Sequence, residues 1–265
     1  MTGPVIHAYR AAEPGLLVNS YLVEAEAGVV VVDTNLLVSD IEALRARLRA
    51  LNKPLLAILV THPHPDHFNG VFGLVQDKEV PVYAAASVAR VIEEIAEAKR
   101  EQWSPTYGAE WPAKTYYPNS LLADRAEVRF GELTFTVREL GPGESHADSY
   151  FLLAADGHTG RWLAALDTLA SELAHVGTLY PGHGDPAGPG ALAGQRRYLL
   201  YYREVVRRLS GGEATLLPTA RAELDAAMQA FLPGAPLTWM IGLGADAVAG
   251  ELAAADPSAA SAAAG

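Results

Sequence analysis

Four side chains that can bind a metal ion fall within six consecutive positions of the sequence. They are His62, His64, Asp66 and His67. The prolines between them, Pro63 and Pro65, restrict the backbone, so a stiff loop presents the four groups. Imidazole and carboxylate suit a borderline divalent cation such as zinc. Because the chain has no cysteine, any metal must be bound by His, Asp or Glu.

The spacing within this loop favours a site for two neighbouring ions. His62 and His64 are two positions apart and point the same way in an extended segment, whereas Asp66 and His67 follow where the chain turns. One loop can therefore serve two adjacent metals. We expect one or two zinc ions per chain, with iron or manganese as alternatives.

The loop follows a predicted strand. Residues 55–60 form a short apolar run that ends directly before the histidines, and the carboxyl ends of strands are where α/β sheets place ligands. Two further strands are predicted before it, and a third segment, 177–180, is predicted to be a strand that delivers His183. The predicted strands and helices, in chain order, are strands 17–23 and 28–33, helix 40–51, strands 55–60 and 80–83, helix 88–99, strands 131–140 and 150–154, helix 159–173, strand 177–180, and helices 190–210, 219–232 and 245–253.

The loop and four weaker motifs together resemble the metallo-β-lactamase superfamily, over about residues 5–190. The supporting motifs are Asn19-Ser20-Tyr21, Asp33-Thr34, Gly143-Glu144-Ser145-His146 and Pro181-Gly182-His183-Gly184. The resemblance implies an α/β fold, the metallo-β-lactamase αββα sandwich of two mixed β-sheets flanked by helices, here with a C-terminal helical extension. The implied domains are 1–190 for this fold, 191–254 for the helical extension packed on it, and 255–265 for a disordered tail.

The resemblance also implies a ligand set. His62, His64 and His146 would hold one ion and Asp66, His67 and His183 the other, with Asp33 supporting the loop. Most hydrolases of the superfamily add an aspartate that bridges both ions. Asp167 has a suitable spacing from His146, but it falls inside the predicted helix 159–173, so we expect a solvated helix residue and a missing bridging segment.

The implied activity is hydrolysis of an ester, lactone, thioester or β-lactam-type bond. Zinc lowers the pKa of bound water to about 7, and the resulting hydroxide attacks the electrophile while Asp66 orients it and accepts its proton. Three alternatives stay open: a mononuclear-iron dioxygenase-like enzyme, a phosphodiesterase, and a catalytically weakened metal-binding protein. The aromatic stretch 102–119 is expected to lie over the site as a lid, or else to be a packed surface loop.

The amino-acid composition indicates which kinds of partner the chain binds. The formal net charge of −11 disfavours nucleic acid, whose binding depends on phosphate contacts with basic residues. No apolar run is long enough to cross a membrane, and no secretory leader is recognisable, so a cytoplasmic protein without membrane contact is expected. The expected partner is a small-molecule substrate, and homo-oligomerisation stays open.

Overall fold

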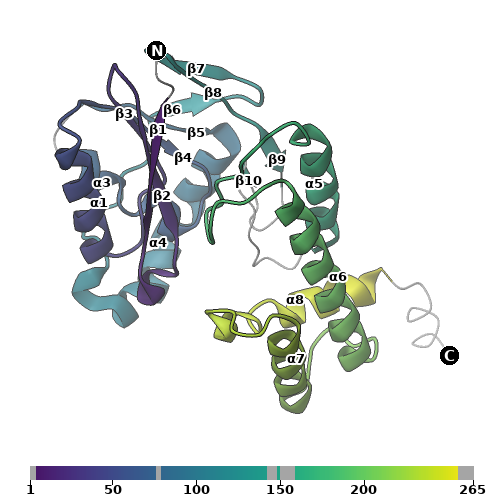
Figure 1. Ribbon diagram of the computed structural model, residues 1–265. Helices are drawn as coiled ribbons and strands as arrows, with labels where there is room; N and C mark the ends of the chain where they lie inside the picture. Colours follow the sequence, from purple (N-terminus) through teal and green to yellow (C-terminus); the bar gives the residue numbers. More distant parts are fainter. Residues whose placement is uncertain (1–3, 76–78, 142–147, 150–158, 256–265) are drawn as a thin grey trace. The chain divides into compact units, whose positions relative to one another are not determined.

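A computed structural model describes residues 4–75, 79–141, 148–149 and 159–255 of the chain (Figure 1). These residues fall into two compact units. The first contains residues 1–141 and 145–152 and takes back the short segment 181–184 later in the chain. The second contains the remaining residues, chiefly 153–180 and 185–265. The two units are described separately.

The first unit is built on a mixed six-stranded sheet in the order β1-β2-β3-β4-β5-β6. The first three strands are antiparallel neighbours, whereas β3, β4, β5 and β6 run parallel. The strands are β1 (Val5–Arg10), β2 (Asn19–Glu24), β3 (Val29–Val32), β4 (Leu55–Val60), β5 (Val82–Ala85) and β6 (Ser120–Leu122). All four valines of β3 are buried, as expected for a strand near the middle of a covered sheet.

Helices cover this sheet through one continuous hydrophobic cluster. Leu44 and Leu48 from the first helix, Val71 from the third and Ile92 from the fourth belong to the same cluster as the strand residue Ile58. The helices are α1 (Val38–Ala50), α2 (Pro65–Phe68), α3 (Val71–Val75) and α4 (Ala86–Tyr107). Helix α1, the pair α2 and α3, and helix α4 each connect one parallel strand to the next, so the loops after β3 and β4 open at the same edge of the sheet.

Two short antiparallel ladders follow the six-stranded sheet. Strands β7 (Glu127–Phe130) and β8 (Leu133–Thr136) form a hairpin, and β9 (Glu139–Gly141) pairs with β10 (Asp148–Ser149). The predicted strand 131–140 is divided: Gly131, with a positive φ of 59°, belongs to the hairpin turn, β8 ends at Thr136, and β9 begins only at Glu139. The α/β class is confirmed. The predicted strand 150–154 lies outside the described residues.

The second unit is helical. Its helices are α5 (Thr159–Glu172), α6 (Gly190–Ser210), α7 (Pro218–Phe231) and α8 (Ala245–Ala254), which confirms the four predicted helices. The predicted strand 177–180 is wrong: only Leu179 pairs, in an isolated bridge with Ala187, because Gly177 and Pro181 bound a run too short for a ladder.

A half-buried carboxylate joins three of these helices. Glu251 of α8 accepts hydrogen bonds from the backbone N–H groups of Thr159 and Gly160, both at 2.9 Å, and from Arg203 of α6 at 2.8 Å. It therefore caps the N-terminus of α5 from another helix. Among the described residues, no helix combines the length and the hydropathy that a membrane span requires.

Candidate metal centre

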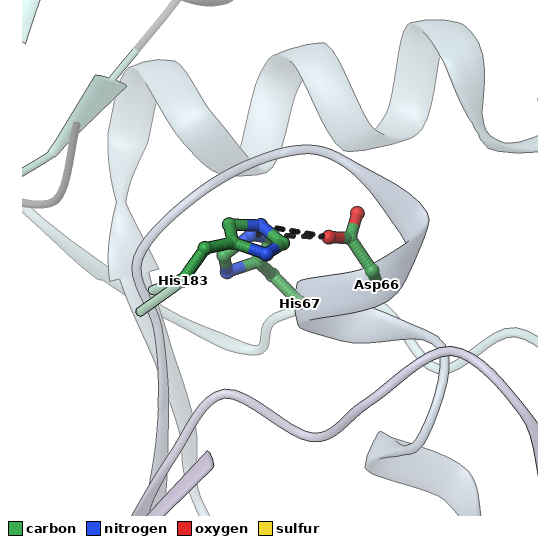
Figure 2. A group of neighbouring side chains, drawn as sticks. All are labelled: Asp66, His67 and His183. Carbon is green, nitrogen blue, oxygen red and sulfur yellow. Dashed lines mark ion pairs between the residues drawn. The ribbon is translucent and has the colours of Figure 1, made fainter. Parts of the chain in front are cut away.

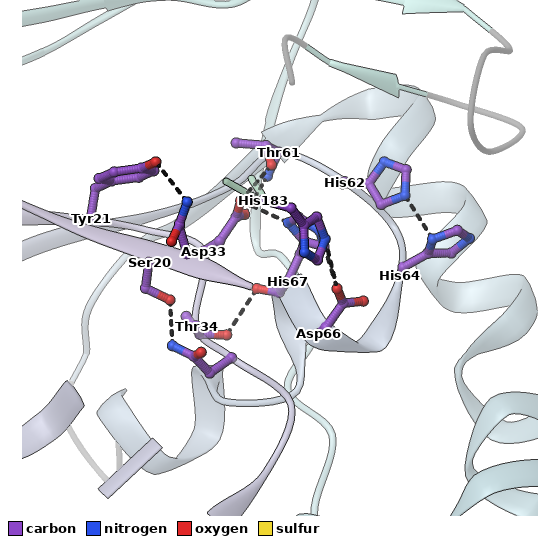
Figure 3. A network of polar contacts seen from close by, with 12 residues as sticks. Ser20, Tyr21, Asp33, Thr34, Thr61, His62, His64, Asp66, His67 and His183 are labelled. Atoms are coloured by element: carbon purple, nitrogen blue, oxygen red, sulfur yellow. Dashed lines mark hydrogen bonds and ion pairs between the residues drawn. The ribbon is translucent and has the colours of Figure 1, made fainter. Parts of the chain in front are cut away.

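The loop that follows β4 places four polar side chains at the carboxyl end of the sheet. His62, Asp66 and His67 are buried, with exposed fractions of 1%, 6% and 4%, although each carries a group that water would solvate well. Pro65 begins the short helix α2, where its fixed φ fits the first helical position. The turn into α2 changes the direction of the chain, so Asp66 and His67 face a point separate from that faced by the preceding histidines (Figure 3).

Asp66, His67 and His183 converge although His183 comes from a distant part of the chain (Figure 2). One potential ligand atom from each lies within 4.8 Å of the other two. The Nε2 atoms of His67 and His183 are 3.5 and 3.4 Å from the same carboxylate oxygen, Oδ2 of Asp66. His183 reaches this point because it pairs with Val18 in an isolated antiparallel bridge at the start of β2.

The remaining nitrogen of each imidazole is held by an acceptor. Nδ1 of His67 lies 2.8 Å from Oδ2 of Asp33, and Nδ1 of His183 lies 2.9 Å from the backbone carbonyl of Leu16. Because a carboxylate and a carbonyl can only accept, both Nδ1 atoms must carry the proton. In the neutral form of each ring the Nε2 atom therefore has the lone pair, which is the form of histidine that binds a cation, whereas in the protonated form both Nε2 atoms donate toward Asp66.

Asp33 fixes the histidine loop as well as the His67 ring. Its Oδ1 accepts the backbone N–H of Thr61 at 2.9 Å, and its Oδ2 accepts the Thr61 hydroxyl at 2.6 Å. The contact with the loop is the one that the resemblance implied. Asp33 has a positive φ of 57°, a conformation that Asp and Asn tolerate better than other L residues.

The backbone at Leu16, whose carbonyl accepts from His183, has the left-handed conformation. Leu16 and Leu17 have φ values of 62° and 56°, and the left-handed region costs about 1–2 kcal/mol for such a residue. The cost is offset where the surrounding structure fixes the conformation. Here the short 3₁₀ turn Glu13–Gly15 precedes Leu16, whose N–H donates to the Glu13 carbonyl at 2.9 Å.

The other predicted ligand group is described only in part. Nε2 of His62 and Nδ1 of His64 are 2.9 Å apart, and the two rings are nearly perpendicular, with centroids 4.3 Å apart. The centroid of His62 is also 5.0 Å from that of His67, so the two groups are adjacent. The third predicted member, His146, lies outside the described residues, so the three-histidine group stays a prediction.

Electrostatics keep Asp66 ionised. Burial alone would raise its pKa, but the charge of His67, the hydrogen bond and charge of His183, and then His64 together hold that pKa well below the ordinary value of 3.8. When both rings are neutral, the donor set is one ionised carboxylate and two imidazole nitrogens that converge on one point. These residues fit a divalent cation such as zinc, which takes nitrogen and oxygen ligands in this number.

An apolar cluster lies beside the centre. Trp111 is buried against Leu36 and Leu37, and the partly exposed Trp103 and Tyr107 pack on the same cluster, together with Leu16. The pKa of Tyr107 is raised, first by burial and then by the nearby charge of Asp66. The aromatic stretch 102–119 is partly helical, since α4 continues to Tyr107, and Tyr107 adjoins the candidate site.

Asp167 has the surroundings of a helix-surface residue. It lies in α5 of the second unit, its side chain is 57% exposed, and its Oδ1 is 2.8 Å from Nε of Arg196 in α6. These features agree with the expectation from sequence that it is a solvated helix aspartate.

Comparison with known proteins places the chain in a family. A sequence model of the metallo-beta-lactamase superfamily matches residues 14–192. The chain therefore belongs to the metallo-beta-lactamase superfamily. A solved beta-lactamase domain protein from Burkholderia ambifaria is similar over 94% of this chain and 86% of its own, with a TM-score of 0.66 and 17% identity. A double mutant of the sec-alkyl sulfatase PisA1 is similar over 97% of this chain and 51% of its own, with a TM-score of 0.61 and 17% identity.

Two curated relatives match shorter segments. A linear primary-alkylsulfatase from a Pseudomonas strain is 40% identical over 60 residues, which are 22% of this chain and 11% of the relative. An (R)-specific secondary-alkylsulfatase from Pseudomonas is 29% identical over 82 residues, which are 29% of this chain and 12% of the relative. The matched part is thus about a tenth of each relative. Superfamily membership makes the fold hydrolase-like, and metal binding is typical of the superfamily.

Proposed function

We propose that this protein is a zinc-dependent hydrolase that cleaves an ester-type bond of a small molecule. The observation that carries the proposal is the convergence of the Nε2 atoms of His67 and His183 on the carboxylate of Asp66. A buried carboxylate beside two imidazoles whose other nitrogens are already occupied is built to bind a cation rather than to stabilise the fold. When bound, the cation supplies Lewis acidity for activating water and for polarising the substrate.

The chain's own residues have separable tasks in this proposal. His67 and His183 bind through Nε2, because Asp33 and the Leu16 carbonyl hold their Nδ1 protons. Asp66 stays anionic at neutral pH, so it serves as a ligand and orients the attacking water. Its low pKa argues against it as the group that keeps the proton. His62 and His64, with His146, are proposed to hold a second ion.

The bond cleaved is proposed from two sources. Superfamily membership favours esters, lactones, thioesters and β-lactams. The two curated relatives carry the name alkylsulfatase, which adds sulfate esters of aliphatic alcohols. The aromatic side chains of Trp103 and Tyr107 beside the centre suit a substrate with an apolar part.

The test is metal-dependent turnover on a defined panel. Protein is stripped with a chelator, reloaded with zinc, and assayed on a nitrophenyl ester, a lactone, a thioester, a chromogenic β-lactam and a linear alkyl sulfate. We expect one class to be hydrolysed, with activity falling about 100-fold or more on chelation and returning with zinc. Metal analysis of protein purified without added metal separates zinc from iron.

Two variants make the test specific. Asp66→Ala should abolish turnover even at saturating zinc, whereas His175→Ala, at an exposed histidine of the second unit, should leave it unchanged. A protein that binds zinc fully but turns over no member of the panel contradicts a hydrolase and favours a metal-binding protein without this activity.

A further inference from the structure

Asn19 bonds to the turn that carries His183 at several points. It is the first residue of β2 and is 2% exposed. Its side-chain Nδ2 donates to the carbonyl of Gly184 at 2.7 Å and to that of Pro181 at 3.0 Å. Its backbone N–H donates to the carbonyl of Gly182 at 2.6 Å. One buried residue thus satisfies acceptors at both ends and in the middle of the Pro181–Gly184 turn.

The direction of the Asn19 amide is fixed from the opposite side. Nε of Arg10 donates to Oδ1 of Asn19 at 3.1 Å, and a guanidinium has no acceptor. The oxygen end therefore faces Arg10 and the NH₂ end must face the turn. The hydroxyl of Tyr21 donates to the same Pro181 carbonyl at 2.5 Å, and this adds a second side-chain donor to the turn.

This turn has little rigidity of its own. Two of its four residues are glycine, and Gly184 has a φ of 93°, which side chains rarely adopt. A β-carbon on Gly182 would lie 3.1 Å from Cε1 of His67, so the turn also touches the neighbouring ligand ring. The position of His183 relative to Asp66 and His67 therefore depends on what holds the turn from outside.

We propose that Asn19 is the positioning residue for His183, with Arg10 setting the direction of its amide. In this role the Asn19 side chain contacts neither metal nor substrate. It holds the turn so that Nε2 of His183 meets Asp66 while Nδ1 meets the Leu16 carbonyl. The inference rests on the proposed function only in taking His183 as a metal ligand.

The test compares two equally buried asparagines in the full-length protein. Asn19→Asp keeps the shape but replaces the donor with an oxygen that faces two carbonyl oxygens. Asn35→Asp is the matched control, because Asn35 is fully buried and donates to Ser20, not to the turn. Zinc affinity is measured by competition with a chromophoric chelator, and stability by thermal unfolding of the metal-free protein. The visible spectrum of the cobalt-loaded protein reports ligand geometry.

We expect Asn19→Asp to weaken one zinc equivalent about 10–100-fold and to change the cobalt spectrum. Asn35→Asp should change that affinity less than about threefold, even if both variants lower the unfolding temperature equally. Equal losses of affinity in the two variants would overturn the proposal, because Asn19 would then act only through general stability. If Asn19→Asp does not fold, Tyr21→Phe removes the second donor to Pro181. Tyr21→Phe is then expected to lower zinc affinity, by less than about 10-fold. Unchanged zinc affinity in Tyr21→Phe counts against the proposal.

The same experiment separates this inference from the proposed function. His183→Ala should remove one zinc equivalent. If it does not, His183 is not a ligand and the proposed centre fails. If it does, while Asn19→Asp leaves zinc affinity unaltered, only the positioning role fails.

Discussion

Replacing Asp33 with asparagine tests whether the tautomer of His67 controls metal binding. Asn tolerates the positive φ of this position, so the substitution changes the chemistry and not the backbone. The carboxylate accepts from the Thr61 N–H, the Thr61 hydroxyl and Nδ1 of His67. An amide has one oxygen and cannot accept from both sides. In the metal-free protein, the arrangement of lowest free energy turns the NH₂ group of the substituted side chain toward the Thr61 hydroxyl and toward Nδ1 of His67. The hydroxyl can rotate to accept, and Nδ1 must lose its proton to accept.

That arrangement moves the proton of His67 to Nε2, where the cation would bind. Binding must then reverse the tautomer and leave the Thr61 N–H facing an NH₂ group. We expect zinc affinity to fall about 10–100-fold, which corresponds to about 1.4–2.8 kcal/mol. The free energy of unfolding of the metal-free protein should fall by less, because every donor can still find an acceptor in the rearranged network.

The assay is chelator competition at neutral pH, with chemical unfolding of the metal-free protein alongside. Thr61→Ser keeps both donors to Asp33 and serves as the control that should bind zinc normally. Zinc affinity of Asp33→Asn within about threefold of the wild type would refute the reasoning, since the tautomer would then be set by something other than Asp33.

Three further predictions concern stability and ligand number. Gly70→Ala should destabilise by about 1–3 kcal/mol or more in chemical unfolding, because its β-carbon would lie 2.0 Å from the Thr34 carbonyl oxygen, whereas Gly188→Ala, with open space around it, should be neutral. Glu251→Gln should cost about 1.5–3 kcal/mol at pH 7. Burial opposes ionisation of Glu251, but its hydrogen bonds hold its pKa below 4.5. Its contribution to the free energy of unfolding is therefore present above pH 4.5 and lost as the pH falls further. An equal effect of Glu251→Gln on stability at pH 3 and pH 7 would contradict this. Asp167→Ala should leave zinc stoichiometry unchanged by metal analysis, and loss of one equivalent would show that Asp167 is a ligand.

The sequence was sufficient where the signal is local. The six positions from His62 to His67 carry four potential ligands, and the apolar run before them predicts β4, so the loop and its place at the sheet edge follow without tertiary information. The helices of the second unit were predicted for the same reason, because their apolar spacing is a property of one segment. The proposed domain boundary at residue 190 stays a prediction.

What the sequence could not supply depends on contacts between distant segments. The acceptor for His183 is the backbone carbonyl of Leu16, 167 residues away, and a carbonyl has no side-chain signature. The motif Asn19-Ser20-Tyr21 was recognised, but its hydrogen bonds to the Pro181–Gly184 turn depend on that turn docking beside β2. The prediction of a strand at 177–180 is wrong for the same reason, since strand formation depends on a distant partner. The composition suits a strand, but among the described residues no neighbouring segment extends the pairing beyond Leu179.

Because residues 181–184 return to the first unit, a cation bound by Asp66, His67 and His183 would cross-link distant parts of the chain. Asp66 and His67 belong to the early part of the chain, whereas His183 comes after α5 has been completed. A bound ion would therefore close a very long loop, and loops of such length lose the most chain entropy when they are closed. Metal affinity should then arise late in biosynthesis, after the second unit has begun to form. A nascent chain that stops before the turn would hold Asp66 and His67 without their partner and would release the ion readily.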